Sequence, residues 1–408
     1  MKRTLLLAVL LLTVPAALRA QTPSGLWDAT LEFNGTNVPF QLEIAVDGEK
    51  AAGWFVNGSE KTASTSGRFE HGTLTLKFDE FGAELSASVN DGALEGLWGP
   101  FQRKYYSIQA KAHAEKAAAA QPAPAIDGLW EIAVRGDRNS EAAWQLIVRQ
   151  DGASASATIL RLSGDTGEIA GGYEDGKFVL NHFSGARVAT LDLTPNADGT
   201  LAVRLFDENG AKRYTAVRPE EARAKGQQSP ADPYEHTKVQ NPSEPLAFRF
   251  PDLGGRIISN TDGRFKNKVV LVNVSGSWNP NSHDQAPFLS DLYRKYRNQG
   301  LEIVSLNFEE ASQLRKPERV KAFVKKYGIE YPVLIGGEPN ERDALLTQPV
   351  NLSAWPTTFF VGRDGTVRFV RAGFPGAASG EFHQEAKKRF IAQVERLLNE
   401  GSDLASSK

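Results

Sequence analysis

The stretch VVLVNVSGSWNPNSHDQAPFLSDL, from Val269 to Leu292, joins an apolar run to a helical pattern. The run Lys268 to Val274 is almost continuously apolar, which is typical of a strand buried on both faces of a sheet. In the next segment, Ser282 to Asn298, apolar residues recur at the spacing of a helix. They are Ala286, Leu289, Leu292, Tyr293 and Tyr296. The sequence therefore predicts a strand, a tight turn at Trp278 and then a helix.

Further elements surround this unit between about residues 246 and 400. A predicted helix begins at Pro317 and ends before Gly328, in keeping with Pro in the first turn and Gly just past the last. The sequence Arg363-Asp364-Gly365 predicts a hairpin turn. The other expected elements are strands at Phe248–Phe250, Leu301–Leu306, Thr357–Val361 and Thr366–Ala372, and a closing helix at Glu381–Leu398.

Several motifs occur in one order in this region. They are KVVLVN at 268–273, Trp278 with Pro280, PFL at 287–289, YGI at 327–329 with YPV at 331–333, and WPTTFF at 355–360. Together they resemble the thioredoxin fold, and more narrowly the exported TlpA/ResA-type thiol-disulfide oxidoreductases and the related redoxins of the AhpC/TSA group. The resemblance covers about residues 246–400 and implies an α/β thioredoxin-like domain.

The two redox cysteines of that family are replaced. The resemblance puts the first cysteine at Asn279 and the second at Ser282, and no cysteine occurs anywhere in the 408 residues. Disulfide exchange requires a thiolate that attacks a disulfide sulfur. The buried acid of thioredoxins corresponds to Asn273, so that proton relay is absent as well. We therefore expect no catalytic residues and no cofactor in this chain, whatever its fold.

A serine nucleophile at Ser282 is a weak alternative. Its neighbour His283 invites the hypothesis of a base, but consecutive residues on a helix point about 100° apart. We expect instead that Ser282 or a neighbour caps the helix by a hydrogen bond.

Without the redox cysteines, the resemblance still implies a binding surface for a polypeptide. It implies that Pro356 is the family's cis-proline, which holds the preceding residue so that its backbone can pair with an extended peptide. Our hypothesis is a binding site for an extended polypeptide or exported protein partner. Its residues are Trp278, Pro280, Trp355, Pro356 and Thr357. The alternative is that the aromatic residues and Pro356 only stabilise the core.

The first half of the chain contains a repeat. Gly25-Leu26-Trp27 returns as Gly128-Leu129-Trp130, and Phe40-Gln41-Leu42 returns as Trp144-Gln145-Leu146. Alternating apolar runs separated by Asp-Gly or Asn-Gly turns predict antiparallel strands, and thus a small barrel or sandwich in each copy. The copies are either separate modules or parts of one closed sheet. We expect most of their tryptophans in the core and the Gly-Leu-Trp motifs at strand starts.

The predicted fold class is therefore multidomain, with two repeated antiparallel all-β modules followed by an α/β thioredoxin-like fold. Alanine-rich and proline-rich segments separate the parts. The expected boundaries are a signal peptide at 1–20, β module 1 at 21–109, a linker at 110–125, β module 2 at 126–218, a linker at 219–245, the thioredoxin-like domain at 246–400 and a tail at 401–408.

The N-terminus has the pattern of a secretory signal. Met1-Lys2-Arg3 is basic, Leu5 to Val14 is apolar, and Ala16 to Ala20 offers small residues for cleavage. The apolar run is short for a membrane span, although an uncleaved anchor is the alternative. We expect export and a periplasmic location, with no further transmembrane segment. The net charge of −2 does not favour binding to nucleic acid. The six histidines are scattered along the chain and do not predict a metal site.

Three functions stay open from the sequence. The first is a non-catalytic role in binding a polypeptide or as a scaffold for an exported partner. The second is membership of the thiol-disulfide oxidoreductase family with its active-site cysteines lost by divergence or replaced by design. The third is an envelope protein that binds its ligand through the β modules.

Overall fold

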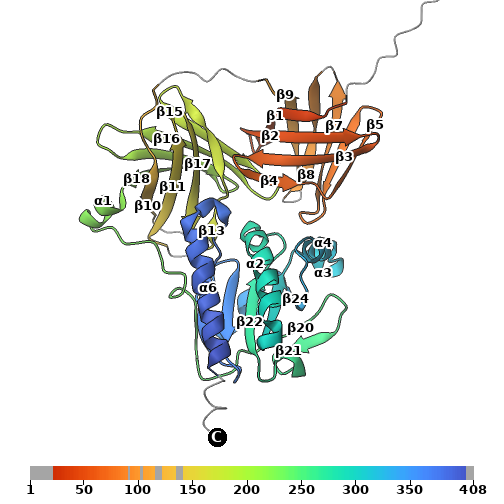
Figure 1. Cartoon of the computed structure of the whole chain (residues 1–408), viewed down its shortest axis with the longest axis vertical. Coiled ribbons are helices and arrows are strands. Elements are labelled where there is room, and N and C mark those ends of the chain that lie inside the picture. Colours follow the sequence, from red (N-terminus) through yellow and green to blue (C-terminus); the bar gives the residue numbers. More distant parts are fainter. Residues whose placement is uncertain (1–21, 91, 102–103, 115–121, 135–140, 401–408) are drawn as a thin grey trace, which may run out of the picture.

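The computed structural model describes residues 22–90, 92–101, 104–114, 122–134 and 141–400. Two β-barrels lie side by side above an α/β domain (Figure 1). This arrangement confirms the predicted fold class. The predicted signal peptide and the tail at 401–408 lie outside the described residues, as does part of the first linker. No helix within the described ranges combines the length and the apolarity needed to cross a membrane.

The first barrel is a closed ring of eight antiparallel strands. Strand β2 pairs with β3 and closes the ring, while β4 extends β3 as a short hairpin. Strand β9 runs to Ala112, which pairs with Trp27, so the module continues past its expected end at residue 109. The strands are β1 Gly25–Phe33, β2 Thr36–Asp47, β3 Lys50–Asn57, β4 Glu60–Ala63, β5 Ser66–Glu70, β6 Thr73–Phe78, β7 Ala83–Asn90, β8 Ala93–Phe101 and β9 Lys104–Ala112.

The second barrel repeats this topology. Strands β11 and β12 close a second ring of eight, and β13 extends β12 as β4 extends β3. The strands are β10 Gly128–Ala133, β11 Ala143–Asp151, β12 Ser154–Arg161, β13 Gly164–Asp165, β14 Ile169–Glu174, β15 Lys177–Phe183, β16 Val188–Pro195, β17 Leu201–Asp207 and β18 Gly210–Val217.

The repeated Gly-Leu-Trp motifs begin equivalent strands, as expected. Trp27 and Trp130 are both buried, and each indole Nε1 donates to the carbonyl four residues earlier, at 2.8 Å to Pro23 and 2.9 Å to Ile126. Inward-facing residues alternate with outward ones along the strands, which gives each barrel its own apolar core.

The two barrels are separate rings that pack against each other. Phe183, Val188 and Phe206 of the second barrel belong to the apolar core of the first. The side-chain amide of Asn57 donates to the carbonyl of Phe183 at 3.0 Å and accepts from its N–H at 2.8 Å. The end of strand β15 thus closes one mouth of the first barrel.

The third domain has a five-stranded mixed sheet with the order β24-β23-β22-β26-β27. Helices α2, α4 and α6 pack on one face, and residues from 246–265 and 346–352 cover the other. The main elements are β22 Val269–Ser275, α2 Pro280–Tyr296, β23 Leu301–Phe308, α4 Glu318–Lys326, β24 Val333–Gly337, β26 Thr357–Val361, β27 Val367–Ala372 and α6 Glu381–Asn399. The smaller ones are β20 Arg249–Pro251, β21 Ile257–Ser259, α3 Ala311–Arg315 and α5 Arg342–Leu345.

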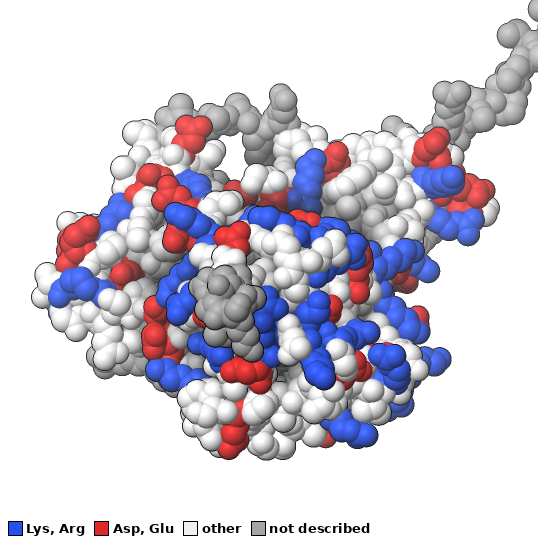
Figure 2. Space-filling model, turned by 60° about the horizontal axis from the view of Figure 1, so that its bottom comes forward, with Lys and Arg blue, Asp and Glu red and all other residues white. Residues whose placement is uncertain are grey.

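The segment expected as the second linker is ordered along the third domain. It begins with the short helix α1 Pro219–Ala224, and β19 Lys238–Val239 later pairs with β25 Pro349–Val350. On the face shown in Figure 2, basic and acidic side chains are interspersed, in line with the small net charge.

Candidate degenerate redox site

The turn before helix α2 carries a helix cap where the resemblance places two cysteines. Asn279 is the N-cap residue, and its Oδ1 accepts from the Ser282 N–H at 3.0 Å and from the Ser282 hydroxyl at 3.3 Å. This satisfies one of the free N–H groups at the start of the helix. The expected cap is thus present, and the two side chains face each other through a hydrogen bond.

His283 is neutral and locked away from Ser282. Burial lowers the pKa of this imidazole to about 3. Its Nε2 donates to the carbonyl of Ser277 at 2.9 Å, and its Nδ1 lies 2.9 Å from the hydroxyl of Tyr327. Both ring nitrogens are therefore occupied, and the arrangement offers no base to the Ser282 hydroxyl.

An amide replaces the buried acid of thioredoxins. Asn273 is buried on β22, where its Oδ1 accepts from the Thr358 hydroxyl at 2.9 Å. The same hydroxyl accepts from the Gln285 side chain at 3.0 Å. This is a fixed polar network of uncharged groups, so it joins the strand to helix α2 without a titratable carboxyl.

A buried carboxylate that sequence reasoning missed holds the turn. Glu309 follows β23 and is fully buried, and it accepts from the N–H of Ser277 at 2.6 Å and from its hydroxyl at 2.8 Å. Arg319 of α4 forms an ion pair with it at 3.0 Å. The only available signal was an acidic residue directly after a predicted buried strand, and such a residue is more often exposed.

The predicted binding residues divide into two groups. Trp278, Pro280 and Trp355 line a cavity of about 1290 Å³, and the two indole rings meet edge to face at 5.5 Å. Pro356, whose peptide bond with Trp355 is cis as expected, and Thr357 are buried beneath it. Among the described residues, no group hydrogen-bonds to the backbone N–H or C=O of Trp355.

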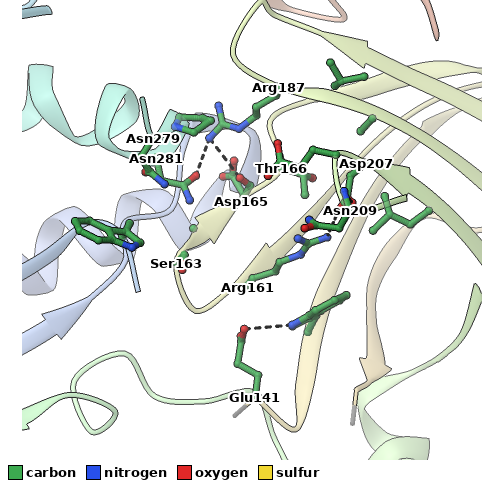
Figure 3. A pocket seen from close by; sticks show the side chains of 18 of the residues that line it. Glu141, Arg161, Ser163, Asp165, Thr166, Arg187, Asp207, Asn209, Asn279 and Asn281 are labelled. Atoms are coloured by element: carbon green, nitrogen blue, oxygen red, sulfur yellow. Dashed lines mark hydrogen bonds and ion pairs between the residues drawn. The ribbon is translucent and has the colours of Figure 1, made fainter. Parts of the chain in front are cut away.

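The cavity lies between the third domain and the second barrel. Figure 3 shows Asn279 and Asn281 on one side and Arg161, Asp207 and Asn209 on the other. The barrel also contributes Trp144, Tyr214, Leu205, Lys212 and Arg213 to the wall. Sequence reasoning did not anticipate this wall, because nothing in the separate repeats indicates which barrel end faces the third domain.

The β12–β13 hairpin and the β15–β16 loop of the second barrel contact the third domain before α6 and at the start of α2. The carbonyl of Ser163 accepts from the Phe374 N–H at 3.1 Å, and Asp165 accepts from the Ser379 N–H at 3.2 Å. Figure 3 shows Arg187 reaching toward Asn281, to which it donates at 2.7 Å. Arg187 also pairs with Asp284 at 2.6 Å. The burial and the nearby Asp284 carboxylate raise the pKa of Asp165.

The first barrel reaches the same helix through its β6–β7 turn. The ring of Phe81 packs on the imidazole of His283 at 5.1 Å between centroids. Beside it, buried Glu80 forms an ion pair with Lys326 of α4. Both barrels therefore contact the first turns of α2, and the degenerate site is enclosed by parts of all three domains.

The fold and this turn define a thioredoxin-like domain with its redox cysteines replaced. The family model of the AhpC/TSA family matches residues 244–370. Thiol-disulfide oxidoreductase ResA of Bacillus thuringiensis subsp. konkukian is 33% identical over 132 residues, which cover 32% of this chain and 68% of ResA. ResA of Bacillus subtilis is 29% identical over 135 residues, or 33% and 69% of the two chains.

A solved thiol:disulfide interchange protein of Chlorobium tepidum is also similar, at 22% identity and a TM-score of 0.29, over 38% of this chain and 97% of that one. The C-terminal domain of this chain belongs to the AhpC/TSA redoxin family and is related to ResA. Because the chain has no cysteine, disulfide exchange is excluded for it.

Proposed function

We propose that this protein is an exported, non-catalytic member of its family that holds an extended segment of a partner polypeptide in the cavity. The observation that carries the proposal is the free backbone of Trp355 at the cavity wall, beside two half-buried tryptophans. A backbone of this kind can pair with an extended chain, and aromatic side chains supply contact area at a small entropic cost.

The dimensions of the cavity support a chain segment as the ligand. Its volume of about 1290 Å³ exceeds the range of about 300–1,000 Å³ that is usual for small-molecule pockets. The second barrel supplies one wall, so the β modules take part in binding rather than forming an independent site.

Binding of fluorescein-labelled extended peptides, measured by fluorescence anisotropy, tests the proposal. We expect Trp278→Ala and Trp355→Ala each to weaken binding at least about tenfold, because buried aromatic anchors dominate such interfaces. Trp54→Ala is the matched control, since this half-buried tryptophan lies on β3 of the first barrel, outside the cavity lining. Equal binding by all variants would show that the tryptophans only stabilise the core.

A disulfide-reduction assay addresses the alternative that the cysteines have been lost from a working enzyme. The chain as it stands should reduce no disulfide substrate, and activity in it would overturn the proposal. Recovery of reduction in Asn279→Cys/Ser282→Cys would show that the enclosed site still admits a substrate.

Export is part of the proposal and rests on the N-terminal sequence pattern. Fractionation of cells that express the full chain should place the shortened, mature protein in the periplasm. Retention of the full-length chain in the membrane fraction would favour the uncleaved anchor.

A further inference from the structure

We propose that the polypeptide segment bound in the cavity is acidic. This inference rests on the proposed function and adds the charge of the ligand. It comes from the side chains of the cavity wall. Most of the carboxylates there are bound by donors of the protein, whereas two cations have no ion-pair partner among the described residues.

Three carboxylates of the wall are engaged by neighbouring donors. Glu141 accepts from the Leu162 N–H at 2.6 Å and from the Trp144 indole at 3.3 Å. Asp207 accepts from the Asn209 N–H at 2.8 Å and pairs with Arg161 at 3.3 Å. Asp165 serves two backbone N–H groups. The fourth, Glu208, lies exposed at the rim.

Two cations of the wall have no carboxylate partner among the described residues. Lys212 and Arg213 are exposed on β18 and line the cavity, and no described acid lies within ion-pair distance of either. Lys212 lies on the same face of its strand as Tyr214 and buried Ala216, because alternate strand residues share a face. Its ammonium group is therefore directed to the barrel side that forms the cavity.

The opposite wall adds a third cation over an aromatic ring. The guanidinium of Arg342, on α5, stacks on the indole of Trp355 at 4.8 Å. Its ion pair at 2.7 Å is with Asp343, whose side chain is 75% exposed. Water weakens such a pair, so the arginine keeps donors for a ligand beside the free Trp355 backbone. Both walls of the cavity therefore carry cations and aromatic rings.

An acidic segment fits both walls at once. Its backbone can pair at Trp355 while its carboxylates approach Lys212 and Arg342, and its apolar groups can contact the indole rings. A basic segment would instead bring its charge against these cations, because three of the four carboxylates of the wall are already engaged. The cavity walls therefore favour acidic over basic sequences.

The test compares three labelled peptides of the same length and extended backbone, one rich in Glu, one with Gln at those positions and one with Lys. We expect the Glu peptide to bind about tenfold tighter than the Gln peptide, the size expected of two exposed ion pairs, and the Lys peptide to bind weakest. The preference should shrink as salt is added. Lys212→Glu/Arg213→Glu should remove the preference for the Glu peptide over the Gln peptide.

Lys104→Glu/Lys111→Glu is the matched control, because it makes the same charge change at exposed positions on β9 of the first barrel. Equal affinity for all three peptides would overturn the acidic preference and leave the proposed function standing. No binding of any peptide would overturn both. A preference that survives the Lys212/Arg213 reversal would place the acidic site elsewhere and overturn the inference. Competition by a carboxylated polysaccharide but not by the Gln peptide would assign the cavity to a glycan.

Discussion

The two barrels share one strand topology but differ in the side chains at equivalent positions near one end. Counted from the turns Asn90-Asp91-Gly92 and Asn196 to Gly199, Trp98 of the first barrel corresponds to Leu205 of the second. Trp98 is fully buried among phenylalanine rings, whereas Leu205, which is also buried, belongs to the lining of the cavity. The first barrel thus has an aromatic ring at this position, and the second has a smaller side chain beside the cavity.

The same comparison holds for one loop of each barrel. The loop after Phe78 presents Phe81 to His283, and the corresponding loop after Phe183 presents Arg187 to Asp284. Neighbouring residues of helix α2 therefore receive an apolar contact from one barrel and an ion pair from the other. The predictions that follow test this division, beginning with the largest expected effect.

Removal of the ion pair between Arg187 and Asp284 should lower the stability of the protein the most. Arg187→Met removes the cation between Asp165 and Asp284 and leaves Asp165 deeply buried. We expect the free energy of unfolding to fall by about 3 kcal/mol, since breaking a buried pair from one side is costly. Denaturant unfolding measures this change in free energy. Phe81→Ala, which removes the contact of the first barrel with His283, serves as the comparison.

Phe81 is only half-buried, so its truncation should cost less than the loss of Arg187. Adding Asp284→Asn to Arg187→Met should recover part of the stability. An Arg187→Met variant as stable as the parent would show that the second barrel is held by its backbone contacts alone.

Exchange of Trp98 and Leu205 should affect the barrels differently. Trp98→Leu gives the first barrel the side chain of the second, and it should lower the free energy of unfolding by about 2–3 kcal/mol because a void replaces the indole. Leu205→Trp forces a larger ring into a position where the leucine is already buried, and it should cost about 1–3 kcal/mol while abolishing peptide binding. Calorimetry and peptide anisotropy on both variants give the two readouts. Unchanged peptide binding by Leu205→Trp would contradict the view that only the second barrel borders the binding cavity at this position.

Local features of this molecule followed from its sequence. The strand before Trp278, the helix after it, the cap at Asn279 and the strands that begin at Gly25 and Gly128 are each set by residues close together in the chain. The fold of the third domain followed from motifs in one order. These predictions succeeded because short-range periodicity and turn chemistry decide them.

The site could be predicted only in part. Trp278 and Trp355 lie together as expected, but Arg187, Asp165 and Glu309 looked like ordinary surface charges in the sequence. The burial of Arg187 and Asp165 depends on how the domains pack, and Asp165 accepts from Ser379, 214 residues away. Glu309 is buried by contacts with Ser277 and Arg319, which lie on other elements of its own domain. Composition and periodicity do not carry that information.

The junction of the barrels should make stability depend on pH. Burial raises the pKa of Glu60 to about 7, near the Glu168 N–H and the charges of Arg187, Asp284 and Asp165. The folded protein therefore holds a proton that the unfolded chain releases near pH 4.5, so this group destabilises the fold as pH rises through that window. Glu60→Gln should match the parent near about pH 5 and exceed it by on the order of 2 kcal/mol near about pH 8.

Thermal unfolding of both proteins across this range measures the difference. Burial lowers the pKa of His182 to about 4 and that of His283 to about 3, so both destabilise the fold as pH falls below about 6.5. The two proteins share these histidines, and their contribution cancels in the comparison. A difference that does not change with pH would show that Glu60 is ionised in the folded state throughout.

The smallest losses of stability should come from the tryptophans that begin equivalent strands of the two barrels. Trp27→Phe and Trp130→Phe keep an aromatic ring at each strand start but remove the indole hydrogen bonds to Pro23 and Ile126. Each should cost about 1 kcal/mol, the usual net value of one such bond. Arg218 stacks on Trp130 at 3.7 Å, which a phenyl ring can still accept. Equal losses, measured by urea unfolding, would show that the copies differ near one end and not at these strand starts, whereas a several-fold larger loss in one barrel would place a difference at the strand starts themselves.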